Sequence, residues 1–243
     1  MKAEQLQLAL RPRPAYEAVD LGVRMTQRGA RSLVRAFLPF GLVLVLACGA
    51  TIEIEPWLPS TLLWWLKPWL DRTLLHIYAR QAFGEETRLG DALAARSAAP
   101  WLPMLQWLTI WRLSFWRAYS MPVGQLEGQA GAARRQRVKA ILRAHRGAAT
   151  MAQGMFSWIE FLLMVGLASL LFWMAPGLRE SGTMRWLFSD SLGSNALLYT
   201  AHATAVLFVE PFFVASGFAM YLNRRVELEA WDVEQDLRHA FAH

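Results

Sequence analysis

The stretch LLYTAHATAVLFVEPFFVASGFAMYLNRRVELEAWDVEQDLR (197–238) decides the fold class of this chain. It begins as an apolar run long enough to cross a bilayer, and the run contains one carboxylate, Glu210. The run ends at a pair of arginines, and the residues beyond them are charged and compatible with a helix. The stretch therefore predicts a membrane span at 196–222 that continues into a cytoplasmic helical tail at 223–243.

The composition extends this interpretation to the whole chain. Of the 243 residues, 55% are hydrophobic and only 18% are charged, whereas about 25% is usual for soluble domains. The apolar residues come in blocks of bilayer length, which predict further spans at 33–52, 58–83 and 151–175. The predicted fold class is all-α, a single polytopic membrane domain over 1–243 with about four transmembrane helices. The single cysteine, Cys48, excludes an intrachain disulfide.

The segment 13–32, before the first span, predicts an amphipathic helix. Apolar residues from Tyr16 to Phe37 share one face, and charged residues share the opposite one: the apolar ones are Tyr16, Val19, Val23, Ala30, Leu33 and Phe37. Two placements fit this pattern, one in the headgroup plane of a bilayer and one against the protein's own cytoplasmic side. The arginines form a predicted interfacial basic face suited to phospholipid headgroups: Arg24, Arg28, Arg31 and Arg35.

The tryptophan-rich segment 101–123 predicts a re-entrant or interfacial helix. Its uncharged part, WLPMLQWLTIW (101–111), is too short to span a bilayer. The basic loop 124–147 is expected to be cytoplasmic together with both chain ends, because Lys and Arg gather in cytoplasmic loops. A full span at 101–123 would put this loop outside. The positive charge of loop 124–147 is interpreted as a determinant of membrane topology. Binding of nucleic acid is not favoured, since the loop has no aromatic side chain to stack on a base.

Charged residues inside the predicted spans form a predicted intramembrane polar cluster. Counted at about 1.5 Å per residue from the inner ends of the spans, they fall in one layer at a depth of roughly 14–17 Å. The inner ends used for this count are Met151, Leu222 and Ala82. The members of the cluster are Lys67, Asp71, Arg72, Glu160 and Glu210.

Because lipid does not solvate charge, these side chains are expected to face the interior of the bundle. Either the two glutamates, Glu160 and Glu210, are expected to approach Lys67 or Arg72, or one carboxylate is expected to be protonated. Both a structural ion-pair network and a proton or ion path fit this arrangement. Catalytic and metal sites are not expected, because the sequence contains no metal-ligand spacing, phosphate loop or nucleophile elbow. No cofactor is predicted.

The helical tail carries an apolar stripe that favours docking, either on the protein's own cytoplasmic face or on a partner. The predicted docking residues are Val226, Trp231, Val233 and Leu237.

Three stretches carry a resemblance: FVEPFFVASGFAMYLNRRVELEAWDVE (208–234), LLWWLKPWLDRTLLHIYARQAFGE (62–85) and RLSFWRAYSMPVGQLEG (112–128). They resemble an uncharacterised family of proteobacterial multi-pass inner-membrane proteins with a C-terminal YLNRRxELExWDxE-type signature. The ending is also distantly similar to membrane domains attached to some glycerophosphodiester phosphodiesterases. Members of the family look like neighbours of MoxR-type ATPases, stage II sporulation protein M-like proteins and transglutaminase-like membrane proteins. The resemblance implies a bacterial inner membrane and a multi-protein assembly.

Three functions are compatible with these features. The first expectation is a non-enzymatic, integral inner-membrane subunit of a larger membrane assembly, with the phospholipid bilayer and other proteins as partners. The alternative is a small transporter or channel-like protein that uses its buried carboxylates. The third is an enzyme acting on a lipid headgroup.

Overall fold

The structure is a computed structural model, and it describes residues 13–85, 87–98, 114–174 and 191–229. Every regular element in these ranges is helical, which confirms the all-α fold class. In chain order the helices are α1 (Ala15–Arg28), α2 (Ala30–Ser32), the π-helical turn η2 (Leu33–Phe37), α3 (Leu38–Gly49), α4 (Leu58–Ala82), α5 (Leu89–Ala98), α7 (Arg117–Gln125), α8 (Gly131–Met174) and α10 (Leu192–Glu229).

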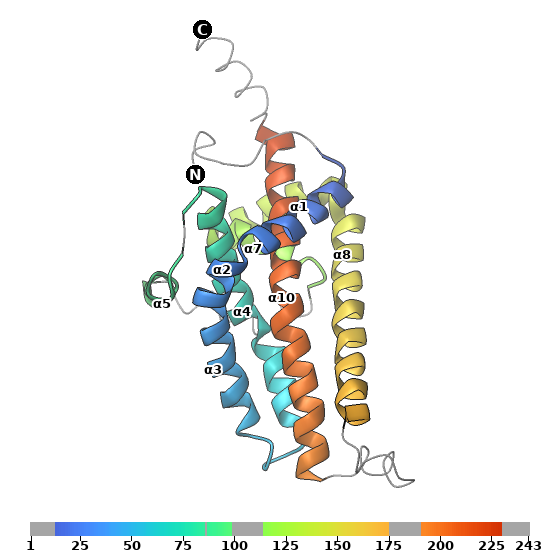
Figure 1. The fold of residues 1–243 in the computed structure, drawn as a ribbon. Helices are drawn as coiled ribbons and strands as arrows, with labels where there is room; N and C mark the ends of the chain where they lie inside the picture. Colours follow the sequence, from blue (N-terminus) through green and yellow to red (C-terminus); the bar gives the residue numbers. More distant parts are fainter. Residues whose placement is uncertain (1–12, 86, 99–113, 175–190, 230–243) are drawn as a thin grey trace.

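The long helices α3, α4, α8 and α10 run side by side along one axis, and α1 crosses α10 obliquely near the end where both termini lie (Figure 1). Within the described residues, three segments are long and apolar enough to cross a membrane, which suggests a membrane protein. They are Ala30–Gly49, His145–Leu170 and Leu192–Glu229, at the predicted spans 33–52, 151–175 and 196–222. The fourth predicted span, 58–83, coincides with α4, whose middle is charged.

The basic segment 124–147 is mostly helix and not the loop predicted from its charge. The helix α8 begins at Gly131 and continues without interruption to Met174. Alanine, glutamine, lysine and arginine dominate the first turns of α8, and all four are strong helix formers. The Lys and Arg side chains of this segment are therefore carried on the same rigid rod as the apolar part of α8.

The helix α1 packs against the bundle, and the predicted apolar face is confirmed in part, since Val19, Leu33 and Phe37 pack in or against the core. Tyr16 is 73% exposed, whereas Ala18 and Gly22 are buried against α10. A Cβ atom on Gly22 would lie 2.4 Å from the Cα of Ser216, so only glycine allows this approach. Close backbone contact thus selects the small residues of α1 for the interface. All four arginines of the predicted basic face are exposed: Arg24, Arg28, Arg31 and Arg35.

Hydrogen bonds show which levels of the helices face one another. The hydroxyl of Tyr78 on α4 donates to the Pro211 carbonyl of α10 at 3.0 Å and lies 3.0 Å from Thr26 Oγ1 of α1. Nearer the other end of the bundle, the Tyr199 hydroxyl of α10 donates to the Val45 carbonyl of α3 at 2.5 Å. The exposed arginines at the end of α1 therefore lie near the level of Pro211.

A polar network joins the ends of α8 and α10 near the termini. Glu127 accepts hydrogen bonds from Arg137 Nε at 2.9 Å and from the Tyr221 hydroxyl at 2.6 Å. Arg137 also pairs with Glu229. The hydrogen bonds to Glu127 hold the pKa of Arg137 above its ordinary value. Val226, the first predicted docking residue, is buried in this part of the protein's own bundle.

We predict that Gly22→Ala lowers stability, because its new Cβ atom would overlap the backbone of α10. Overpacking of this kind costs about 1–3 kcal/mol. Gly166→Ala on α8 is the matched control, since nothing lies within 4 Å of its Cβ position. The midpoint of thermal unfolding in detergent checks both variants. Equal midpoints for the two would contradict the close approach of α1 and α10.

Candidate functional site

Five charged side chains from four helices meet inside the bundle, and we call them the ion cluster. α4 contributes Lys67 and Asp71, α7 contributes Arg117, α8 contributes Glu160 and α10 contributes Glu210. Lys67 and Asp71 share one face of α4 because they lie four residues apart. The cluster thus links helices that are far apart in the sequence.

Each cation of the ion cluster contacts two carboxylates. Lys67 Nζ lies 2.5 Å from Glu160 Oε2 and 2.7 Å from Glu210 Oε2. Arg117 Nε lies 2.6 Å from Asp71 Oδ2, and its Nη2 donates to Glu210 Oε1 at 2.8 Å. The two carboxylate oxygens of Glu210 therefore bridge Lys67 and Arg117.

Burial differs across the ion cluster. The side chains of Asp71 and Glu210 are 0% and 1% exposed, whereas that of Glu160 is 15% exposed. The guanidinium carbon of Arg117 also lies 5.4 Å from the centre of the Phe213 ring, a cation–π contact. Removing one partner of a buried ion pair leaves an uncompensated charge, so the innermost members depend strongly on one another.

The structure brings together four of the five residues of the predicted cluster and replaces the fifth. Glu160 and Glu210 both approach Lys67, one of the two expected partners. Arg72 forms no ion pair with any described residue, and its carbonyl accepts a hydrogen bond from Gln125 Nε2 at 2.9 Å. Adjacent helical residues point about 100° apart, so turning Asp71 inward turns Arg72 away.

Arg117 takes the place of Arg72, and sequence reasoning missed it. Residues 114–123 belong to the predicted re-entrant or interfacial segment 101–123, and every residue from Arg117 to Val123 is buried against the bundle. One signal was available: the segment AYSMPV (118–123) after Arg117 has no other charge, as expected for buried chain. The rest of the predicted segment, 101–113, lies outside the described residues.

The other predicted site residues lie away from the ion cluster. The basic face of α1 is exposed on the side of the bundle, and Val226 is buried near the end of α10. The remaining docking residues lie outside the described part of the chain: Trp231, Val233 and Leu237.

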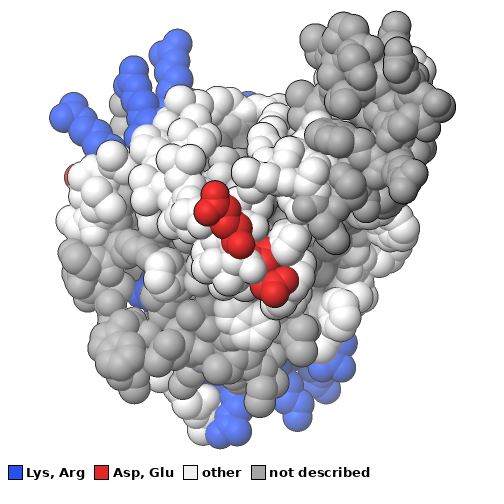
Figure 2. Space-filling view, turned by 90° about the horizontal axis from the view of Figure 1, so that it is seen from below, with Lys and Arg blue, Asp and Glu red and all other residues white. Residues whose placement is uncertain are grey.

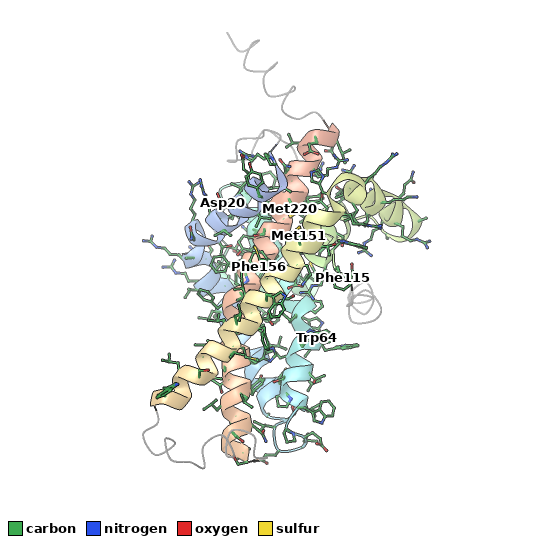
Figure 3. The ribbon with its side chains drawn as sticks, turned by 90° about the vertical axis from the view of Figure 1, so that its right-hand side faces the viewer. Asp20, Trp64, Phe115, Met151, Phe156 and Met220 are labelled. Atoms are coloured by element: carbon green, nitrogen blue, oxygen red, sulfur yellow. The ribbon has the colours of Figure 1, made fainter. Side chains whose placement is uncertain are left out.

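A groove between α4 and α8 reaches the ion cluster from the side of the bundle. Its inner part, about 350 Å³, is lined by Lys67, Arg117, Glu160 and His202 among others. An outer part of about 530 Å³ overlaps it and includes Trp64, Phe115, Trp158 and Phe161. In Figure 3, Trp64 and Phe115 lie on the same side of α8. The groove thus combines charged groups inside with aromatic rings outside.

Glu160 is the cluster carboxylate that borders this groove. One of its oxygens, Oε2, accepts a hydrogen bond from Lys67. The other, Oε1, lies 3.9 Å from His202 Nε2, too far for a hydrogen bond. Among the described residues, no donor hydrogen-bonds this oxygen. The described residues also contain no group of three or more His, Cys, Asp or Glu side chains placed to hold a metal ion.

Comparison of the chain with protein-family models, curated proteins and solved structures finds no match. The resemblance to the inner-membrane family therefore stays an expectation from the three quoted stretches. These stretches do meet in the structure: the first supplies Glu210, the second Lys67 and Asp71, and the third Arg117.

We predict that Arg117→Met destabilises the protein by about 3–5 kcal/mol, because Asp71 and Glu210 would lose a buried cation. The double variant Arg117→Met with Asp71→Asn should recover part of this loss, since one charge of each sign is then removed. Unfolding in detergent measures the interaction energy of the pair. Arg72→Met, one residue along α4, is the control and should change stability little. A loss that is equal in Arg72→Met and Arg117→Met would contradict the assignment.

Proposed function

We propose that the chain is an integral membrane protein with four spans, formed by the Ala30–Gly49 segment, α4, α8 and α10. The inner edge of the hydrocarbon lies near Pro211. From Leu192 to Pro211, α10 is about 28 Å long at 1.5 Å per residue, close to the hydrocarbon thickness of about 30 Å. The exposed arginines of α1 near this level support the same edge, since they favour headgroups and water.

An inner hydrocarbon edge near Pro211 changes the depth expected for the ion cluster. Taking Leu222 as the inner edge gives roughly 14–17 Å, but Glu210 adjoins Pro211, where the exposed arginines favour the boundary. The ion cluster then lies at the cytoplasmic edge of the hydrocarbon and not at its centre. The helix α7, which runs from Arg117 beside Glu210 towards Glu127 beside Tyr221, becomes an interfacial element.

Charge distribution supports cytoplasmic termini. At the end of the bundle opposite the termini, the turn between α3 and α4 carries the exposed Glu53 and Glu55. Figure 2 views this end and shows acidic side chains near its centre, with Lys and Arg at the rim. The positive-inside bias puts this end outside the cell and the basic start of α8 in the cytoplasm. A bacterial inner membrane follows from the family resemblance.

We predict opposite labelling of two single-cysteine variants in a Cys48→Ala background. Ala132→Cys, in the basic start of α8, should react with a membrane-impermeant maleimide only after the cells are opened. Glu55→Cys should react in intact cells. Mass spectrometry of the purified protein counts the labels, and labelling of both sites from the same side would refute the four-span topology.

We further propose that the protein binds an amphiphilic ligand that enters the groove between α4 and α8 from the bilayer. The observation that carries this proposal is the groove itself, which connects exposed aromatic rings to buried charged groups. Its volumes of about 350 and 530 Å³ lie within the range of about 300–1,000 Å³ found for small-molecule sites. Ligand pockets typically combine apolar walls with a few polar groups that fix orientation.

The position of the groove favours a ligand with an apolar tail. Both walls belong to proposed spans. The α8 residues that line the outer part, such as Ser157 and Trp158, precede Glu160, so the groove opens at the level of the headgroups, next to lipid. Trp64, Trp158 and Phe161 are exposed on these walls, where an acyl or aryl chain would cover them. The polar part lies near the proposed inner edge, where a headgroup can reach it without crossing the hydrocarbon.

We predict that Ser157→Trp removes ligand binding, because the indole would fill the groove that Ser157 lines. Ser169→Trp is the matched control: it makes the same change on the exposed surface of α8, away from the groove-lining residues. Native mass spectrometry of protein purified from membranes reports bound amphiphiles. A bound species retained equally by both variants would count against the groove as the site.

The non-enzymatic subunit of a larger membrane assembly, which the sequence favours first, stays a prediction. Its docking stripe continues beyond Glu229 into residues outside the described part of the chain. The ligand-binding proposal is closer to the transporter-like alternative, since both use the charged groups inside the bundle.

A further inference from the structure

We infer that the amphiphile bound in the groove carries a positively charged ammonium group, which Glu160 receives. This inference rests on the proposed binding function and adds the chemical class of the ligand. Four features of the ion cluster and groove support it: the occupancy of the cations, the free oxygen of Glu160, the balance of charge and the aromatic lining of the outer groove.

The cations that line the groove are already engaged. Lys67 Nζ contacts Glu160 and Glu210 within 2.7 Å, and the Arg117 side chain contacts Asp71 and Glu210 within 2.8 Å. An anionic headgroup would have to displace one of these carboxylates from its partner. Since separating a buried ion pair leaves an uncompensated charge, an anion is a poor occupant.

The hydrogen-bonding capacity that is left unused in the groove is that of an acceptor oxygen. Glu160 Oε1 borders the groove and receives no hydrogen bond from the described residues, and His202 Nε2 is 3.9 Å away. An ionised carboxylate accepts several hydrogen bonds, so this oxygen suits an N–H donor on a ligand. Charge-assisted bonds between an ammonium and a carboxylate are stronger than neutral ones.

The charge balance of the ion cluster also favours a cationic ligand over an anionic one. Two cations, Lys67 and Arg117, face three carboxylates in the ion cluster, so the cluster carries no excess positive charge that would attract an anion. With all five groups ionised it carries one excess negative charge, which a monocationic ligand neutralises without disturbing any existing pair.

The outer part of the groove also favours a cation. Its lining includes Trp64, Trp158 and Phe161, and the rings of Trp158 and Phe161 lie 5.9 Å apart in an edge-to-face arrangement. Aromatic faces attract ammonium groups through their quadrupole. An ammonium headgroup entering past these rings is therefore attracted along the path to Glu160.

Two sources supply this chemistry, an amine-headgroup phospholipid of the inner leaflet and a free amphiphilic amine. Titration of the full chain in maltoside detergent, followed by tryptophan fluorescence and native mass spectrometry, compares dioctanoyl phosphatidylethanolamine, dioctanoyl phosphatidylglycerol, octylamine and octanol. Octylamine should bind about tenfold or more tightly than octanol, since the two differ in the charged group. Octylamine that binds more tightly than octanol identifies the ammonium as sufficient, and phosphatidylethanolamine that binds more tightly still identifies a lipid headgroup as the source.

The decisive variant is Glu160→Gln, which keeps an acceptor for Lys67 but removes the negative charge. It should weaken ammonium binding about tenfold or more, whereas Glu85→Gln, which alters a carboxylate paired with Arg80 outside the groove, should leave it unchanged. If Glu160→Gln does not fold, the octylamine and octanol comparison on the unaltered chain carries the test.

The outcomes separate the inference from the proposed function. Phosphatidylglycerol that binds as tightly as phosphatidylethanolamine, and is lost in Ser157→Trp, would overturn the cationic ligand but keep the groove as a binding site. Octanol that binds as tightly as octylamine would also overturn it. If no probe binds in a way that Ser157→Trp abolishes, both proposals fail.

Discussion

The buried carboxylate of Glu210 is the constraint on which the arrangement of the helices depends. A carboxylate that is 1% exposed needs compensating charge, and Glu210 obtains it from Lys67 on α4 and Arg117 on α7. These two contacts fix α4 and α7 against α10, and Lys67 extends the connection to α8 through Glu160. The closely packed glycines complete the assembly: a Cβ atom on Gly217 would lie 2.4 Å from the Cβ of Ala118 on α7.

The helices of the bundle are packed differently. Towards the termini, α1, α4 and α7 surround α10 so closely that nearly every residue from Val209 to Asn223 is buried. By contrast, α8 is largely exposed along its apolar window, of which only 11% is buried, and its exposed residues lie on both sides of Glu160. Lipid can cover an exposed apolar helix in place of protein, as expected if α8 is a span.

Hydropathy and the counting of depth along the spans predicted part of the fold and four members of the ion cluster from the sequence. Three of the four predicted spans coincide with segments long and apolar enough to cross a membrane, as the length of their apolar runs indicates. The meeting of Lys67, Asp71, Glu160 and Glu210 follows from the high cost of charge in lipid. Arg117 could not be found this way, because α7 is only 9 residues long and its place is set by tertiary contacts. The predicted apolar face of α1 was wrong at Tyr16 for a related reason: hydrophobicity favoured Tyr16, while close packing selected Gly22.

The sequence left open whether the intramembrane charges are structural or functional, and burial divides them between these roles. Asp71 and Glu210 are sealed inside the bundle and bound to cations on rigid helices, so a ligand could reach them only by breaking the packing. Glu160 is bound on one oxygen and borders the groove with the other. The same ion cluster can therefore lock the helices through its inner carboxylates and bind a ligand through its outer one. Because Lys67 contacts Glu160 and Glu210 together, a ligand charge at Glu160 would act directly on the cation that holds α4 to α10.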